Sequence, residues 1–169
     1  MSRPKPTDFP EYFGRYIAKV EADSLHDAVK KYAASLESFY TNLPQNKADH
    51  AYSPGKWTLK EVLQHIIDAE RVFAYRILRI ARKDKTPLAS FDENAFAEHA
   101  HASSRSFEDL KNEFRAVRQA TDLLIASLND EQLAEQGIAS NNPITANAIG
   151  FIVYGHMIHH KQIAEERYL

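Results

Sequence analysis

Three of the eight histidines in this 169-residue chain lie in the stretch Gly155–Lys161, which reads GHMIHHK. His156 and His160 are four residues apart, so on a helix they would lie one turn apart on the same face. Two imidazoles in this arrangement can share one metal ion. The alternative is a pair of core histidines that are hydrogen-bonded to other polar groups. The stretch is therefore a candidate metal site that needs a helix to position it.

The residues around the pair predict such a helix over about 145–167. Its apolar stripe consists of Ile149, Ile152, Val153 and Ile163. At about 100° per residue, His156 lies at the centre of this stripe and His160 lies about 40° from the centre. His159 lies about 60° to the other side, at the margin. Because burial of two imidazoles requires polar partners or an ion, the inward position favours metal binding.

A third ligand is expected from a helix that faces this one. Thr58 and Glu61 form a capping box at the start of a helix predicted over about 59–83. His65 lies about 10 Å from the start of that helix, and the His156–His160 pair lies roughly 14 Å from the end of the last helix. If the two helices are antiparallel, all three imidazoles lie at similar depth, so His65 is the predicted third ligand.

The other histidines are weaker candidates. His26 is the rival third ligand, because it flanks the apolar stripe of a helix predicted to follow Asp23 and Ser24. His50, His99 and His101 are expected in loops and exposed to solvent.

Four long helices are predicted in total. They cover about 25–43, 59–83, 106–128 and 145–167. This pattern predicts an all-α protein, a four-helix bundle formed by a single domain over residues 1–169. Residues 84–105 have no clean period and can form a long crossover between the second and third helices. Residues 1–22 are an aromatic lead-in that is expected to lie across the domain. Residues 129–136 are expected to form a short turn, and residues 137–145 a loop.

Composition excludes several classes of site and partner. There is no cysteine, so disulfides, thiol nucleophiles and cysteine–zinc sites are absent. The net charge of −2 predicts no affinity for nucleic acid or anionic membranes. The N-terminus lacks a signal-peptide core, and no apolar run approaches the roughly 20 residues of a membrane span. A cytoplasmic protein is therefore expected.

Three segments together resemble a known family. They are GKWTLKEVLQHIIDAERVFAYRILRIAR, TPLASFDENAF and VYGHMIHHKQIAEERYL, and the lead-in YFGRYIAKVEADSL fits as well. The most specific parts are Trp57, the His65–Asp68 spacing and the pattern of Gly155, His156 and His160. With these features the chain resembles the DinB/YfiT-like family of metal-dependent proteins over nearly its whole length.

The resemblance implies a four-helix bundle with a long crossover, in which His65, His156 and His160 bind a divalent metal. Similar proteins tend to be dimers, and some are transferases or isomerases that depend on bacillithiol, mycothiol or glutathione. Others resemble amide hydrolases. A second apolar strip on the last helix, formed by Phe151, Tyr154 and Ile158, must also be buried. Either the lead-in or a second subunit can cover it; the lead-in is favoured, and a homodimer through another surface is expected.

Three neutral imidazoles leave a divalent ion with an open position, which is typical of catalytic rather than structural sites. Zinc suits three histidines best, with nickel, iron and manganese as alternatives. The expected activity is that of a thiol-dependent transferase or a hydrolase acting on a small molecule. The alternative is a non-catalytic, stress-associated module whose ion stabilises the bundle.

Two further residues are candidates for the chemistry. Asp68, one turn beyond His65, can orient an imidazole or act as a base. Arg76 lies about 20° from the His65 face and can bind a substrate carboxylate. The alternatives are a solvent-facing acid and a surface arginine.

Overall fold

A computed structural model of the protein describes all residues from 1 to 169. The four predicted long helices are confirmed, with each end within two residues of the prediction: α2 (Leu25–Thr41), α3 (Leu59–Ala81), α5 (Phe107–Ala126) and α7 (Ala146–Arg167). Each of these helices is capped at its start by a side-chain oxygen that accepts a hydrogen bond from a backbone N–H of the first turn. The capping residues are Ser24, Thr58, Ser106 and Thr145. The capping box of Thr58 and Glu61 is present.

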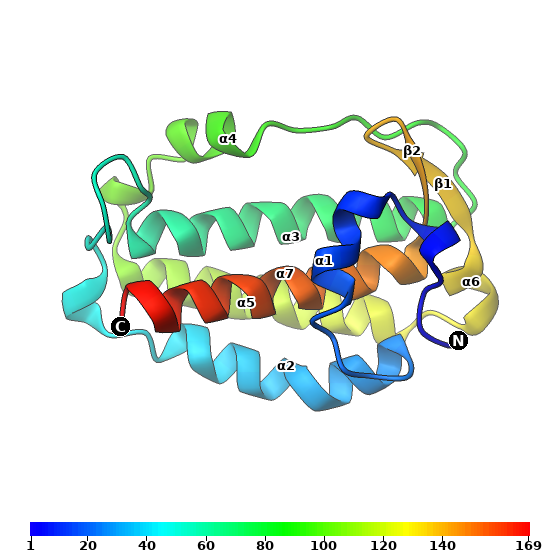
Figure 1. Cartoon of the computed structure of the whole chain (residues 1–169), viewed down its shortest axis with the longest axis horizontal. Helices are drawn as coiled ribbons and strands as arrows, with labels where there is room; N and C mark the ends of the chain where they lie inside the picture. The colour runs from blue at the N-terminus through cyan, green and yellow to red at the C-terminus, as the bar shows by residue number, and fades with distance from the viewer.

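The four helices form a bundle in which α3 packs against α5 and α7, and α2 packs against the same two helices from the opposite side (Figure 1). Helices α3 and α5 run in one direction, whereas α2 and α7 run in the other (Figure 1). The two helices that carry His65 and the His156–His160 pair are therefore antiparallel neighbours, as a shared site requires.

The segment between α3 and α5 returns along the bundle to the end where α3 begins (Figure 1). It includes a short helix, α4 (Glu93–His99), which is capped by the Asp92 carboxylate. His99 was expected in a loop and is instead the last residue of α4, because the Asp92 cap starts a helix that the weak apolar period of this segment does not reveal. His101 lies outside the helices in a left-handed conformation.

Residues 136–145 form a β-hairpin, so the prediction of a loop over 137–145 was wrong. Strand β1 (Gln136–Ala139) pairs antiparallel with β2 (Asn142–Thr145). The two turn residues, Ser140 and Asn141, have positive φ values of 51° and 63°, the geometry of a tight hairpin turn. The hairpin is also hydrogen-bonded to the crossover. The Leu88 N–H donates to the carbonyl oxygen of Ile138, and the Ser140 N–H donates to the carbonyl oxygen of Leu88. Residues before it form the short helix α6 (Asp130–Ala134).

The N-terminal lead-in lies across α7, as expected (Figure 1). It contains 3-10 turns at Pro6–Asp8 and Glu11–Phe13 and one turn of helix, α1 (Gly14–Ile17). The contact is closest at Gly155, where a Cβ atom would lie 2.1 Å from the carbonyl oxygen of Tyr16. Only glycine allows the two backbones to approach this closely.

Much of helix α7 is enclosed, because α1, α2 and α3 all pack on it. Every residue from 146 to 157 is buried. Phe151 lies beneath the Arg3 guanidinium at 5.5 Å, so the lead-in covers this part of the second apolar strip. Tyr154 instead faces the interior, where Arg118 donates to its hydroxyl over 3.0 Å.

Arg118 belongs to a polar cluster inside the bundle. Its guanidinium is buried and forms an ion pair with Glu70 of α3 at 2.7 Å and another with Asp122 of α5. The cluster joins α3, α5 and α7 without lining the histidine site. None of the helices is both long enough and apolar enough to cross a membrane.

Candidate metal centre

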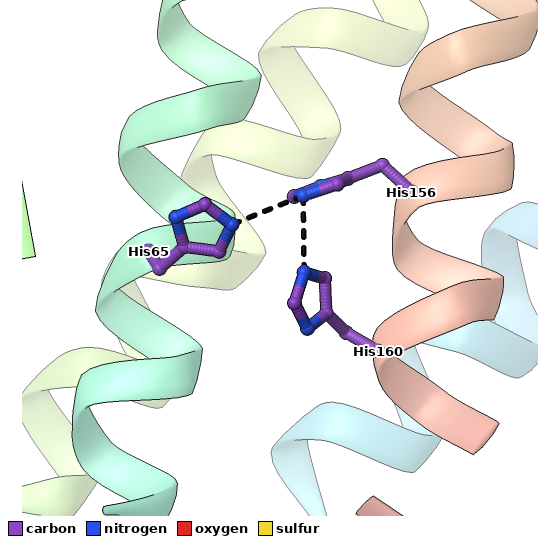
Figure 2. Close-up of side chains that lie close together, drawn as sticks. All are labelled: His65, His156 and His160. Atoms are coloured by element: carbon purple, nitrogen blue, oxygen red, sulfur yellow. Dashed lines mark hydrogen bonds between the residues drawn. The ribbon is translucent and has the colours of Figure 1, made fainter. Parts of the chain in front are cut away.

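His65 of α3 and His156 and His160 of α7 point toward one another between the two helices (Figure 2). The Nε2 atom of His156 lies 3.1 Å from the Nε2 atom of His65 and 3.1 Å from that of His160. The ligand atoms of all three residues lie within 4.8 Å of one another. The structure thus brings together the three histidines that the sequence singles out.

Helix geometry and helix direction produce this convergence. The four-residue spacing places His156 and His160 one above the other on the face of α7 that α3 covers. His65 reaches the same point from the first third of α3, because α3 runs antiparallel to α7 (Figure 1). His26, the rival ligand, lies in the first turn of α2 and is not part of the group.

Hydrogen bonds alone do not satisfy the three rings. His156 Nε2 carries either one proton or one lone pair, so only one of its two contacts at 3.1 Å can be a good hydrogen bond. In a tetrahedral zinc site with bonds of about 2.0–2.1 Å, ligand nitrogens lie roughly 3.3 Å apart. The observed cluster fits such an ion after small side-chain movements.

The histidines are also in the protonation state that a metal requires. Burial lowers the pKa of His65 to about 4 and that of His160 to about 3. Burial and the neighbouring imidazoles hold the pKa of His156 well below its usual value of 6.5. All three rings are therefore neutral at pH 7, so a metal would displace no protons from imidazolium groups.

Aromatic rings enclose the three histidines. The Trp57 ring lies 4.8 Å from that of His65, and Tyr16 of α1 contacts His156 and His159 at 5.6 and 5.4 Å. Phe73 lies 6.0 Å from His156. His159 is only half-buried and is not part of the trio. This enclosure fixes the imidazoles and limits access of water to them.

Two cavities reach the histidines from different sides. One, of about 130 Å³, is lined by His65, His156, Arg76 and Tyr16, among others. The other, of about 240 Å³, is lined by His160, Trp57, Lys56 and Tyr168, among others. A small molecule can therefore approach the centre of the trio.

Arg76 and Asp68 lie in different surroundings. Arg76 is buried and lines the smaller cavity beside His65 and His156. Asp68 accepts a hydrogen bond from Gln64 at 3.0 Å and lines a separate cavity of about 620 Å³ with Arg71 and Arg105. No hydrogen bond joins Asp68 to His65, so the structure brings only Arg76 to the histidine site.

Sequence reasoning did not identify Tyr16, Glu93 or Ser140, which also line the smaller cavity. Tyr16 had a signal, the unusual aromatic content of the lead-in. Glu93 and Ser140 had none, because they reach the cavity only through the path of the crossover and the tight turn of the hairpin.

The family model of the DinB superfamily matches residues 28–164 of the chain. The chain belongs to the DinB superfamily. The match includes all three histidines of the centre and most of the bundle.

Two solved structures share the fold of this DinB superfamily member. One is YfiT from Bacillus subtilis, described as a probable metal-dependent hydrolase with an unusual four-helix bundle topology. It has 20% identity and a TM-score of 0.67, with 96% of this chain and 91% of YfiT covered. The other is a mycothiol-dependent maleylpyruvate isomerase, with 11% identity, a TM-score of 0.66, and 92% of this chain and 60% of the isomerase covered. A search of curated protein sequences gives no significant match. At these identities the likeness supports the fold, and the predicted four-helix bundle is confirmed.

Proposed function

We propose that His65, His156 and His160 bind one divalent metal ion, and that the protein is a metal-dependent enzyme acting on a small molecule. The observation that carries the proposal is the convergence of three neutral imidazoles, two buried and one partly buried, that cannot satisfy one another by hydrogen bonds. Zinc is the ion best suited to three histidine nitrogens, with nickel, iron or manganese as alternatives.

The number of ligands favours catalysis over a structural role. No fourth histidine, aspartate or glutamate joins the group, whereas structural zinc sites are closed by four protein ligands. When bound, an ion with a free position acts as a Lewis acid that lowers the pKa of a water or thiol ligand. The two adjacent cavities provide room for that ligand and for a substrate.

The chain's own residues would position the reactants. Trp57 and Tyr16 hold the imidazole rings and exclude water from one side of the site. The Arg15 guanidinium donates to the Tyr16 hydroxyl at 2.9 Å, and burial raises the pKa of Tyr16 to about 12. The hydroxyl therefore remains protonated at pH 7 and is available as a hydrogen-bond donor rather than a base.

The specific reaction we propose is thiol-dependent transfer, with hydrolysis as the second candidate. The presence of two separate cavities at the trio favours transfer, because a second organic reactant needs a second site, whereas a hydrolase needs only water. The solved structures of similar fold include a mycothiol-dependent isomerase and a protein described as a probable metal-dependent hydrolase. We also propose that the protein acts in the cytoplasm, where such thiols are abundant.

A thermal-melting experiment tests the thiol proposal. We expect glutathione, mycothiol or bacillithiol to raise the melting temperature of the zinc-loaded protein, because a thiolate completes the coordination of the ion. The metal-free protein is the control and should not respond. If no thiol shifts the zinc-loaded protein, the transferase proposal is wrong and the hydrolase remains.

A further inference from the structure

Arg76 is a buried cation without a counter-ion. It is 5% exposed, and its only hydrogen bonds run from Nη2 to the carbonyl oxygen of Ala89 at 2.7 Å and to the Ser140 hydroxyl at 3.1 Å. Burial lowers the pKa of this guanidinium, and no neighbouring carboxylate offsets that effect. Its contact with the Phe91 ring, at 5.8 Å, compensates only part of the charge. A buried guanidinium in this state is costly unless a ligand or water completes its surroundings.

Arg76 has unused donors, and its side chain lines the cavity that contains the histidines. A guanidinium has five N–H groups, and the two on Nη2 are occupied, so the Nε and Nη1 donors remain. Arg76 lines the same cavity of about 130 Å³ as His65 and His156. Neutral contacts from Ala89 and Ser140 hold the side chain in place without neutralising its charge, which is how a binding group for an anion is positioned.

The cavity favours a carboxylate over a more highly charged anion. No lysine or second arginine lines it, and its walls include the apolar side chains of Ala69, Phe73 and Phe91. One guanidinium matches the single charge of a carboxylate, while the apolar walls suit a short hydrocarbon chain. Glu93, the only acidic residue at the cavity, is exposed and forms no ion pair with Arg76.

The distance between Arg76 and the histidines sets the length that a bound molecule needs to reach both. Arg76 is eleven residues after His65, about 16 Å along the helix and on nearly the same face. Side chains on a helix lean toward its N-terminus, which directs that of Arg76 back toward His65. A molecule that reaches from Arg76 to the histidines therefore carries its charge several bonds from its reacting group.

We propose that the substrate is a small organic acid whose carboxylate binds Arg76 while its reacting group lies at the three histidines. The substrate class rests on the proposed function, because the reacting group is placed at the metal. The carboxylate site itself depends only on residues of the chain and can be tested without a metal.

The test is an NMR titration of the metal-free protein with butyrate and hexanoate, alongside their neutral amides, butyramide and hexanamide. We expect saturable binding of the acids, at least tenfold tighter than that of the amides, with amide resonances of Ala89 and Ser140 among those that shift. This part needs no mutation, so a folding defect cannot obscure it. Binding of acid and amide with equal affinity, no saturable binding of either acid, or tighter binding of inorganic phosphate would each overturn the proposal.

Three variants localise the effect. Arg76→Gln should weaken binding of the acids at least tenfold, whereas Arg82→Gln, which removes an exposed guanidinium after the same helix, should change it less than twofold. Arg76→Lys, which keeps the charge, should retain part of the affinity and serves if Arg76→Gln folds poorly. If a folded Arg76 variant binds the acids as tightly as the wild type does, the assignment of the carboxylate site to Arg76 is wrong.

The same variants separate this proposal from the metal site. Zinc content of the Arg76 variants should equal that of the wild type, because Arg76 is not among the three ligands. If acids bind Arg76 but the protein holds no metal, the proposed function fails and the carboxylate site stands.

Discussion

The Nε2 atom of His156 lies 3.1 Å from those of His65 and His160, and this arrangement follows from two features of the sequence. The four-residue spacing within α7 is local and could be predicted from helix geometry. The choice of His65 over His26 required an assumption about helix direction, which the antiparallel arrangement of α3 and α7 satisfies (Figure 1).

The surroundings of Arg76 could not be predicted in the same way. Its hydrogen-bond partners, Ala89 and Ser140, are 13 and 64 residues away along the chain. They reach it only because the crossover and the hairpin bond to each other beside α3. Asp68 could be placed on the helix, but its hydrogen bond with Gln64 depends on side-chain directions that periodicity does not specify.

Trp57 provides a direct probe at the residue scale. It is the single tryptophan of the chain, and its ring lies 4.8 Å from that of His65. Metal binding places a positive charge beside the indole, so we expect titration with zinc to change the intrinsic fluorescence saturably, with nickel quenching it more strongly. His160→Ala should abolish the change at the same metal concentrations. An identical titration curve for wild type and His160→Ala would show that the metal binds elsewhere.

At the scale of elements, the long helices and their caps could be predicted because they depend on local sequence. The hairpin was missed because Asn141, Asn142 and Pro143 indicate a break in regular structure, and the same residues are compatible with a tight two-residue turn between strands. Helix α7 could be predicted although it carries a second apolar strip, because Ile149, Ile152, Val153 and Ile163 keep a helical spacing.

The contact between α1 and α7 gives a prediction for Gly155. A Cβ atom there would lie 2.1 Å from the Tyr16 carbonyl oxygen, and this is a backbone atom that cannot rotate away. We expect Gly155→Ala to lower the free energy of unfolding in urea by about 1–3 kcal/mol through overpacking. It should also displace Tyr16 from His156.

Gly14→Ala is the matched control, because the nearest atom to its Cβ would be a Phe9 side-chain carbon at an ordinary distance of 3.7 Å. Alanine should leave stability unchanged or increase it slightly at this helical position. Equal effects of the two substitutions would mean that α1 does not pack on α7 as described.

At the scale of the molecule, one apolar core extends over 37 buried residues from the lead-in to Tyr168. A core of this size predicts a fold that does not depend on the ion, in contrast to small zinc domains that unfold without metal. The single-domain organisation predicted from length remains a prediction, as does the expected homodimer.

Removal of the metal should therefore lower stability without unfolding the bundle. We expect the chelated protein to keep its far-ultraviolet circular dichroism at 25 °C and to melt roughly 5–10 °C below the zinc-loaded protein, as binding at about a hundred times Kd provides. Reloading with zinc should restore the melting temperature. Loss of the helical signal on chelation would instead support the non-catalytic module whose ion holds the bundle together.

The central claim is that His65, His156 and His160 hold one ion, and elemental analysis tests it most directly. Wild type, His160→Ala and His159→Ala should be loaded with zinc, dialysed together and measured in parallel. Because His159 is the adjacent imidazole outside the trio, we predict about one ion per chain in wild type and His159→Ala, and little in His160→Ala. Equal zinc content in His160→Ala and wild type would contradict the account.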